Sequence, residues 1–190
     1  VNTGMIRAMA NLTRSSKEAL DGEPSEYFES FNHAIGTAVE PGSTFKLASL
    51  MTAMSEGDVK ANDEIDTGNG ITYFYGKRMS DSNADQGGSG ILNTTEIFEL
   101  SSNVGTALTI KKAFGENPQE FLDGLQSIGV DTPTGVRLAG ESTPQVYQNA
   151  GDGRWSGLSL TQMSIGYEVT QTPLQTLTLY NAVANNGTSL

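Results

Sequence analysis

Cysteine is absent from the 190 residues, and histidine occurs once, at His33. Without cysteine the chain can form neither a disulfide framework nor a thiolate metal site. One histidine rules out a multi-histidine metal cluster, and a Ser-His-Asp arrangement would depend entirely on that residue. If a serine is activated in this chain, a lysine is therefore the better candidate for its helper.

Long apolar runs are also missing. No segment approaches the ~18 apolar residues of a membrane span, and the start, Val1-Asn2-Thr3-Gly4, is not a signal peptide, so we expect this chain to be soluble. Basic residues are few: 11 Lys and Arg stand against 22 Asp and Glu, which gives a net charge of −11. This charge repels phosphate backbones and anionic lipids, so nucleic acid is not an expected partner.

The length predicts one compact unit, and 22 glycines with only 17% charged residues indicate many loops. The alternation over residues 5–10 predicts a strand of a hairpin, and the polar stretch 11–30 predicts an irregular surface excursion. The glycine-rich stretch 58–92 predicts loops and a small hairpin around Tyr73-Phe74-Tyr75.

Helix signals occur in four places. A Pro41-Gly42 break precedes a helix that ends at Gly57 and whose buried face is predicted to carry Leu47, Leu50, Met51 and Met54. The other three helical regions are a capping pair Asn93/Glu96 with helices on both sides of Ser101-Ser102-Asn103, the second ending at Gly115; a helix from Asn117-Pro118 to Gly129; and a helix from Thr172-Pro173 to Asn185-Asn186-Gly187.

The segment Ser43-Thr44-Phe45-Lys46 can supply a nucleophile and a base. On a helix, residues three apart share a face, so the Lys46 amine can reach the Ser43 oxygen, and the helix N-terminus favours an alkoxide. Lys46 must be neutral to act, which requires burial or a nearby cation. The pattern S-x-x-K is weak by itself, because a chain of this length contains about one by chance.

A second element of the right type lies downstream at Ser101-Ser102-Asn103. Ser101 could pass a proton to a leaving group, and the Asn103 amide could orient a substrate amide. Two rivals remain open: Ser30-Phe31-Asn32 fits the same expression, and Tyr147-Gln148-Asn149 would place a tyrosine in the serine's role. We favour Ser101 because a predicted turn between two helices lets side chains project into a cleft.

Three segments together carry a resemblance: Glu40-Pro41-Gly42-Ser43-Thr44-Phe45-Lys46, Ser101-Ser102-Asn103-Val104-Gly105, and the stretch 164–175 (SIGYEVTQTPLQ). In this order they resemble the transpeptidase domain of class B penicillin-binding proteins, especially the cell-division type, over nearly the whole chain. The resemblance implies an α+β fold of the penicillin-binding-protein and serine β-lactamase kind, in which an antiparallel sheet is flanked by helices. We expect residues 1–190 to form part of such a domain, with an incomplete sheet.

The resemblance also implies the chemistry. Ser43 would attack the D-Ala-D-Ala amide of a peptidoglycan stem peptide, and β-lactams would acylate the same serine. Lys46 would be the general base, Ser101 the proton shuttle and Asn103 the substrate holder, with the Ser43 backbone N–H as half of the oxyanion hole. No metal and no organic cofactor is implied.

Three departures from the family pattern stand out. None of the six lysines is followed by Thr-Gly or Ser-Gly, so the third family motif is absent, and we expect that the chain is truncated before it. Glu168 stands where the family usually has glycine, and His33 where it often has arginine. We interpret both as differences between lineages.

The expected setting follows from the resemblance as well. The parent protein is expected to be anchored in the cytoplasmic membrane, with its catalytic domain outside in the cell envelope, the periplasm, and with partners in the division machinery. The alternatives are a serine β-lactamase, a β-lactam sensor of the same fold, or an inactive fragment. A β-lactamase is disfavoured, because Ser89 precedes Leu92-Asn93 where one large class has a glutamate, and another class has valine in place of Asn103.

Overall fold

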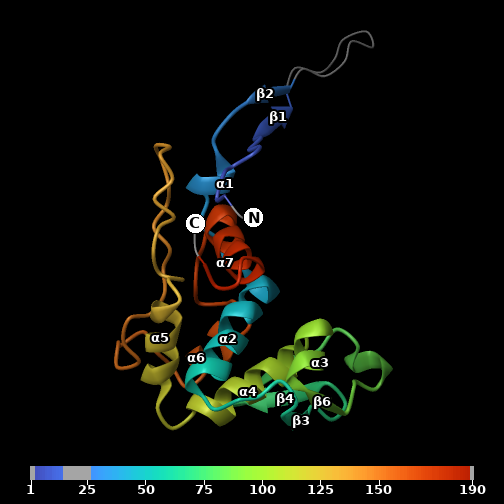
Figure 1. Ribbon diagram of the computed structural model, residues 1–190. Coiled ribbons are helices and arrows are strands. Elements are labelled where there is room, and N and C mark those ends of the chain that lie inside the picture. Colours follow the sequence, from blue (N-terminus) through green and yellow to red (C-terminus); the bar gives the residue numbers. More distant parts are fainter. Residues whose placement is uncertain (1–2, 15–26, 189–190) are drawn as a thin grey trace.

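The computed structural model describes residues 3–14 and 27–188 (Figure 1). In chain order the elements are β1 (Leu12–Arg14), β2 (Tyr27–Glu29), α1 (His33–Gly36), the 3₁₀ helix η2 (Gly42–Phe45), α2 (Lys46–Glu56), β3 (Glu64–Asp66), β4 (Ile71–Phe74), β5 (Lys77–Ser80), the 3₁₀ helix η3 (Ala84–Gln86), β6 (Ile91–Asn93), α3 (Thr94–Glu99), α4 (Asn103–Phe114), α5 (Pro118–Ser127), α6 (Ser159–Met163) and α7 (Pro173–Ala184).

Strands and helices are largely segregated along the chain, which is the α+β class that the motifs imply. The strands form three antiparallel pairs, β1–β2, β3–β6 and β4–β5. Figure 1 shows the β1–β2 hairpin projecting at one end of an elongated molecule, with the other two pairs beside α3 and α4 at the opposite end. Within the described ranges no sheet is larger than a pair, so the expected incomplete sheet is present only as these short ladders.

The strand predicted at residues 5–10 is wrong. These residues have no regular secondary structure and are mostly exposed, and the strand of this region is β1, which pairs Leu12 with Glu29 and Arg14 with Tyr27. Alternation alone does not make a strand, because the ladder hydrogen bonds need a partner. The predicted excursion 11–30 therefore contains both strands of a hairpin, and its residues 15–26 lie outside the described part of the chain.

The helix predicted after Pro41-Gly42 opens as the 3₁₀ helix η2, which contains Ser43, and continues as α2 only from Lys46. Its end is as predicted, with Gly57 following its last residue. Its buried face differs from the prediction: Leu50 is buried, but Met54 is 48% exposed. Helices α3, α4 and α5 pack around α2, so its buried positions are mainly small or polar: Lys46, Ala48, Ser49, Thr52 and Ala53. Small side chains allow helix axes to come close together.

The predicted capping pair at Asn93 and the predicted helix start at Thr172-Pro173 are both confirmed. Asn93 accepts a hydrogen bond from the Glu96 backbone N–H, and the Glu96 carboxylate accepts from the Asn93 N–H, both at 2.9 Å. Thr172 and Gln175 make the same exchange at the start of α7. These bonds satisfy the donors that a helix N-terminus leaves free.

One main core holds the helices together. It joins buried side chains of η2, α2, α4, α5, α6 and two loop residues: Phe45, Ala48, Ala53, Ile110, Phe114, Phe121, Leu122, Leu125, Leu160 and Met163, with Val130 and Val169 from loops. A smaller cluster packs the β4–β5 hairpin on α4 through Phe74, Met79, Val104, Ala107 and Ile165. The hairpin is thus fixed to the helix whose first residue is Asn103.

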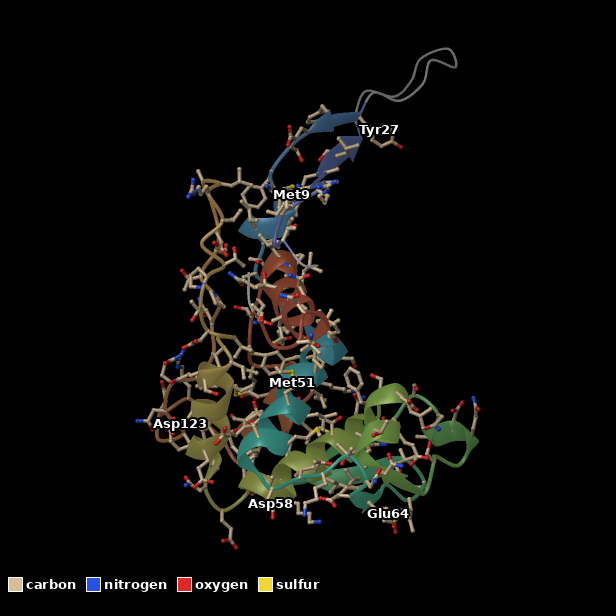
Figure 2. The ribbon with its side chains drawn as sticks, in the orientation of Figure 1. Met9, Tyr27, Met51, Asp58, Glu64 and Asp123 are labelled. Atoms are coloured by element: carbon tan, nitrogen blue, oxygen red, sulfur yellow. The ribbon has the colours of Figure 1, made fainter. Side chains whose placement is uncertain are left out.

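Figure 2 places these parts along the molecule. Tyr27 lies at the outer end of the β1–β2 hairpin, whereas Asp58 and Glu64 lie at the opposite end of the molecule. In the part of the chain that the structure describes, no helix has both the length and the apolar character needed to cross a membrane.

The close contact between α2 and α5 gives a stability prediction. A Cβ atom added at Gly124 would lie 2.4 Å from Thr52 Cγ2, inside the packed interface. Gly124→Ala should lower the free energy of unfolding by about 1–3 kcal/mol despite the better helix propensity of alanine, as measured by urea denaturation. Gly153→Ala is the control, because a Cβ there would meet nothing within 4 Å; an equal effect of both changes would contradict the packing argument.

Candidate active site

Ser43 lies in η2, directly before α2. A 3₁₀ helix has three residues per turn, so side chains three positions apart eclipse one another, and Ser43 and Lys46 project from the same side. The Lys46 backbone N–H donates to the Ser43 carbonyl, which closes this turn. Ser43 is exposed, whereas Phe45 and Lys46 are each only 1% exposed. Ser43 therefore lies at the surface, one 3₁₀ turn before a buried lysine.

The Lys46 amine is held by Ser101. Lys46 Nζ donates to the Ser101 carbonyl at 2.5 Å and lies 3.0 Å from Ser101 Oγ. Burial disfavours the charged ammonium and lowers the pKa of Lys46 to about 8, although the negative charge of Asp81 acts in the opposite direction. A lysine that is to act as a base near neutral pH needs a lowered pKa, and burial gives Lys46 one.

Ser101 occupies an unusual backbone conformation between α3 and α4. Its φ of +53° lies in the left-handed region, which costs a side-chain-bearing residue about 1–2 kcal/mol. The Ser101 N–H donates to Phe98 O at 3.1 Å, and the Ser102 hydroxyl caps α4 by accepting from the Gly105 N–H at 2.8 Å. The turn is thus held by the helices on both sides of it.

Asn103 is the first residue of α4, and its amide is partly engaged. Asn103 Nδ2 donates to the Ser80 carbonyl at 3.0 Å. An amide nitrogen has two hydrogens, so a second donor and the carbonyl oxygen are left for other contacts. The bond to Ser80 fixes the side chain beside Ser101 without using up its capacity.

The loop around Gly166, which is distant in the sequence, contacts the turn that carries Ser43. The Gly42 N–H donates to the Gly166 carbonyl at 3.1 Å, and a Cβ at Gly166 would lie 2.0 Å from the Gly42 carbonyl oxygen. Gly166 also has φ +84°. Only glycine permits both this conformation and this approach of two backbones.

The neighbouring Glu168 is in the left-handed region as well, with φ +58°. Its N–H donates to Glu40 Oε1 at 2.9 Å. Glu40, the first residue of the segment that contains Ser43, is therefore also bonded to the loop of Gly166 and Glu168. The position at which the sequence departs from a glycine therefore keeps the backbone conformation that glycine favours.

The rival candidates lie elsewhere. Asn32 exchanges hydrogen bonds with Asn11 and Met9 at the base of the hairpin. Tyr147 packs edge-on against Trp155, and its hydroxyl donates to Arg154 O. His33 Nδ1 lies 2.8 Å from Thr37 Oγ1, a local contact. Of the alternatives weighed in the sequence, the structure brings Ser101 to Lys46.

Several residues of this site were not singled out in the sequence. Asp81 accepts from the Ser102 hydroxyl at 2.8 Å and from the Val104 N–H at 2.9 Å. Its only sequence signal is a carboxylate after a predicted strand, and no fixed spacing connects it to Ser101. Gly166 could have been suspected as a left-handed turn residue, but not as a contact of Gly42. Over the described ranges, no group of three or more His, Cys, Asp or Glu side chains is arranged to hold a metal ion.

Comparison with known proteins identifies the family. The sequence model of the penicillin-binding protein transpeptidase domain matches residues 1–190. The chain therefore belongs to this family, and the motifs and the α+β fold described above agree with that membership.

Curated relatives make the relationship more specific. The chain is 31% identical over 188 residues to "Peptidoglycan D,D-transpeptidase FtsI" of Escherichia coli K12, covering 98% of this chain and 29% of that protein. It is 30% identical to "Penicillin-binding protein PbpB" of Mycobacterium tuberculosis, covering 97% of this chain and 26% of that protein. The chain thus spans less than a third of the length of these relatives.

Solved structures share the fold. The transpeptidase domain of Burkholderia pseudomallei penicillin-binding protein 3 superposes with a TM-score of 0.71 at 24% identity, covering 82% of this chain and 44% of that one. Penicillin-binding protein 3 of Mycobacterium tuberculosis complexed with aztreonam gives 0.68 at 29% identity, covering 82% of this chain and 33% of that one.

The contact between Gly42 and Gly166 gives a second prediction. Gly166→Ala should lower the free energy of unfolding through both backbone strain and the clash with Gly42, by about 2–5 kcal/mol in total. Gly129→Ala is the matched control, because Gly129 has a similar φ of +76° but a Cβ there would meet nothing within 4 Å. Thermal and urea unfolding of both variants separates the two effects; equal losses would show that the clash is relieved without cost.

Proposed function

We propose that this chain supplies the nucleophile and the base of a peptidoglycan D,D-transpeptidase, which cross-links stem peptides through a serine acyl-enzyme and is acylated by β-lactams. The observation that carries the proposal is the buried Lys46 amine, one 3₁₀ turn from the exposed Ser43 and held by both Ser101 oxygens.

In the first step, Ser43 Oγ attacks the carbonyl carbon of the D-Ala-D-Ala amide while Lys46 takes the serine proton. A protonated lysine has three donors and no acceptor, whereas a neutral amine has two hydrogens and one lone pair. With its hydrogens on the carbonyl and Oγ of Ser101, a neutral Lys46 keeps that lone pair for the Ser43 proton. Burial makes the neutral form accessible, since it brings the pKa to about 8.

In the second step, the amide bond breaks and the leaving amine needs a proton. Ser101 Oγ lies 3.0 Å from Lys46 Nζ, so a proton taken from Ser43 can pass through Ser101 to that amine. Asn103, fixed by its bond to Ser80, offers its remaining amide groups to the peptide of the substrate. The Ser43 backbone N–H contributes to the oxyanion hole at the head of η2.

The relatives support the same reading. Those compared above are named as a peptidoglycan D,D-transpeptidase and as a penicillin-binding protein, and a solved neighbour is titled as a complex with aztreonam. We carry the substrate, the sensitivity to β-lactams and a role in cell division over to this protein by that similarity. No observation favours a β-lactamase or a sensor.

The wider setting is part of the proposal. The chain covers 44% of a solved transpeptidase domain, which supports residues 1–190 as one part of such a domain. A membrane anchor, an extracytoplasmic catalytic domain and partners in the division machinery are proposed for the parent protein through its resemblance to FtsI. Because the third family motif is not in these residues, the isolated 190 residues should bind β-lactams weakly or not at all.

Labelling with a fluorescent penicillin tests the function. The full-length protein should take up one label per molecule at Ser43, located by peptide mass spectrometry, and Ser43→Ala should take up none. Ser101→Ala should slow labelling about a hundredfold or more, whereas Ser30→Ala, which changes the other Ser-x-Asn serine, should not. Absence of label on the wild-type protein would refute the transpeptidase reading, and loss of label within seconds would indicate a β-lactamase.

The pH dependence of acylation tests the base. Below the pKa of about 8 the neutral fraction of Lys46 falls tenfold per pH unit, so the rate should rise with pH and level off above about 8. Lys46→Arg retains the charge but has no accessible neutral form, so it should lose the reaction by about a hundredfold or more. A rate that is flat from pH 6 to 9 would exclude Lys46 as the base.

A further inference from the structure

The end of strand β5 is tied to the turn that carries the candidate catalytic residues. Three consecutive residues of that turn contact Ser80 and Asp81: the Ser102 hydroxyl donates to Asp81 Oδ2 at 2.8 Å, Asn103 Nδ2 donates to Ser80 O at 3.0 Å, and the Val104 N–H donates to Asp81 Oδ1 at 2.9 Å. Both carboxylate oxygens of Asp81 are therefore used on this turn.

These bonds act on groups that cannot easily find other partners. Ser102 is 3% exposed and Val104 is 1% exposed. A buried hydroxyl or N–H without an acceptor is costly, and a carboxylate at a helix N-terminus interacts favourably with the helix dipole. Asp81 is thus the anchor of the first turn of α4.

The anchored turn determines where Ser101 stands. Ser101 keeps its left-handed φ of +53° between Phe98, whose carbonyl accepts its N–H at 3.1 Å, and Ser102, whose hydroxyl is bound to Asp81. A conformation that is rarely populated persists only when its surroundings determine it. The Ser101 oxygens, which hold Lys46, depend on that conformation.

We propose that Asp81 is a positioning residue for the reaction: through Ser102 and Val104 it fixes the turn whose Ser101 oxygens orient the Lys46 amine. The inference rests on the proposed function, in which Lys46 is the base and Ser101 the proton shuttle. Asp81 does not touch either of them by a hydrogen bond, so its action on them is through the turn and through its charge.

The charge of Asp81 gives it a second effect on Lys46. Charged side chains on the elements packed around Lys46 are Glu56 on α2, Glu96 and Glu99 on α3, Lys111 and Lys112 on α4, and Glu120 and Asp123 on α5. Among the described residues only Asp81 shifts the Lys46 pKa by its charge, and it raises that pKa against the larger lowering by burial. Removing the charge should therefore make Lys46 lose its proton at lower pH.

Asp81→Asn tests the charge. Asparagine has the same shape and can still accept from the Val104 N–H, but it carries no charge, and its amide nitrogen cannot accept from the Ser102 hydroxyl, so the rate of acylation should fall as well. In the full-length protein the midpoint of the pH profile of β-lactam acylation should fall by about half a pH unit or more. NMR of isotope-labelled lysine, with Lys46 assigned by its loss in Lys46→Arg, should show the same downward shift in the titration of Lys46.

Ser102→Ala separates the geometry from the charge. It removes one of the two partners of Asp81, together with the cap on the Gly105 N–H, and leaves the carboxylate in place, so acylation should slow about tenfold while the midpoint stays at its wild-type value. Asp85→Asn is the control for a change of charge close by, because Asp85 is exposed and exerts no effect on the Lys46 pKa. It should leave both the rate and the midpoint unchanged.

The outcomes distinguish the two proposals. If the wild-type protein is not acylated but the Lys46 titration shifts in Asp81→Asn, the proposed function fails and the link between Asp81 and Lys46 holds. If the wild-type protein is acylated and Asp81→Asn and Ser102→Ala both match it in rate and midpoint, the positioning role is overturned. Should Asp81→Asn not fold, Ser102→Ala alone decides, since an unchanged rate there overturns the role.

Discussion

A primary amine enclosed by packed helices is the constraint on which the rest of this structure depends. Lys46 is as inaccessible to solvent as its neighbour Phe45, which belongs to the main core that also joins α4, α5 and α6. Burying an ammonium is unfavourable unless acceptors replace its water, and Ser101 provides two of them. The fold thus has to provide hydrogen-bond acceptors for an amine beside its main apolar core, and the Ser101 carbonyl and hydroxyl oxygens provide them.

Apolar packing positions the helices and the hairpin, whereas polar contacts position individual side chains and turns. The main core fixes the axes of α2 and α4, and the second cluster fixes the β4–β5 hairpin against α4. Single hydrogen bonds then position the two candidate site segments within these packed elements. The Gly42 N–H donates to the Gly166 carbonyl at the turn of Ser43, and the Ser102 hydroxyl donates to Asp81 next to Ser101. A side chain can be placed this accurately only because the elements that carry the bonds are themselves held by the core.

The sequence predicts well those features that depend on neighbours in the chain. The capping pair at Asn93, the start of α7 at Thr172-Pro173 and the end of α2 at Gly57 all involve residues within one turn of each other. It fails where the partner is distant. Residues 5–10 alternate like a strand but have no ladder, Met54 follows the spacing of a buried face but is exposed, and the contacts of Asp81 and Gly166 have no local signature. Local patterns fix helix ends, whereas burial and long-range contacts depend on how the elements pack.

The hydrogen bonds between residues 164–171 and the segment around Ser43 have a consequence for folding during translation. Val39 exchanges backbone hydrogen bonds with Gln171 at 3.0 Å, and Gly42 donates to Gly166 at 3.1 Å. During translation the ribosome adds these later residues long after the serine has emerged, and a loop of this length must close before the contacts form. In the nascent chain, the turn that carries Ser43 therefore lacks these contacts until residues 166–171 have left the exit tunnel.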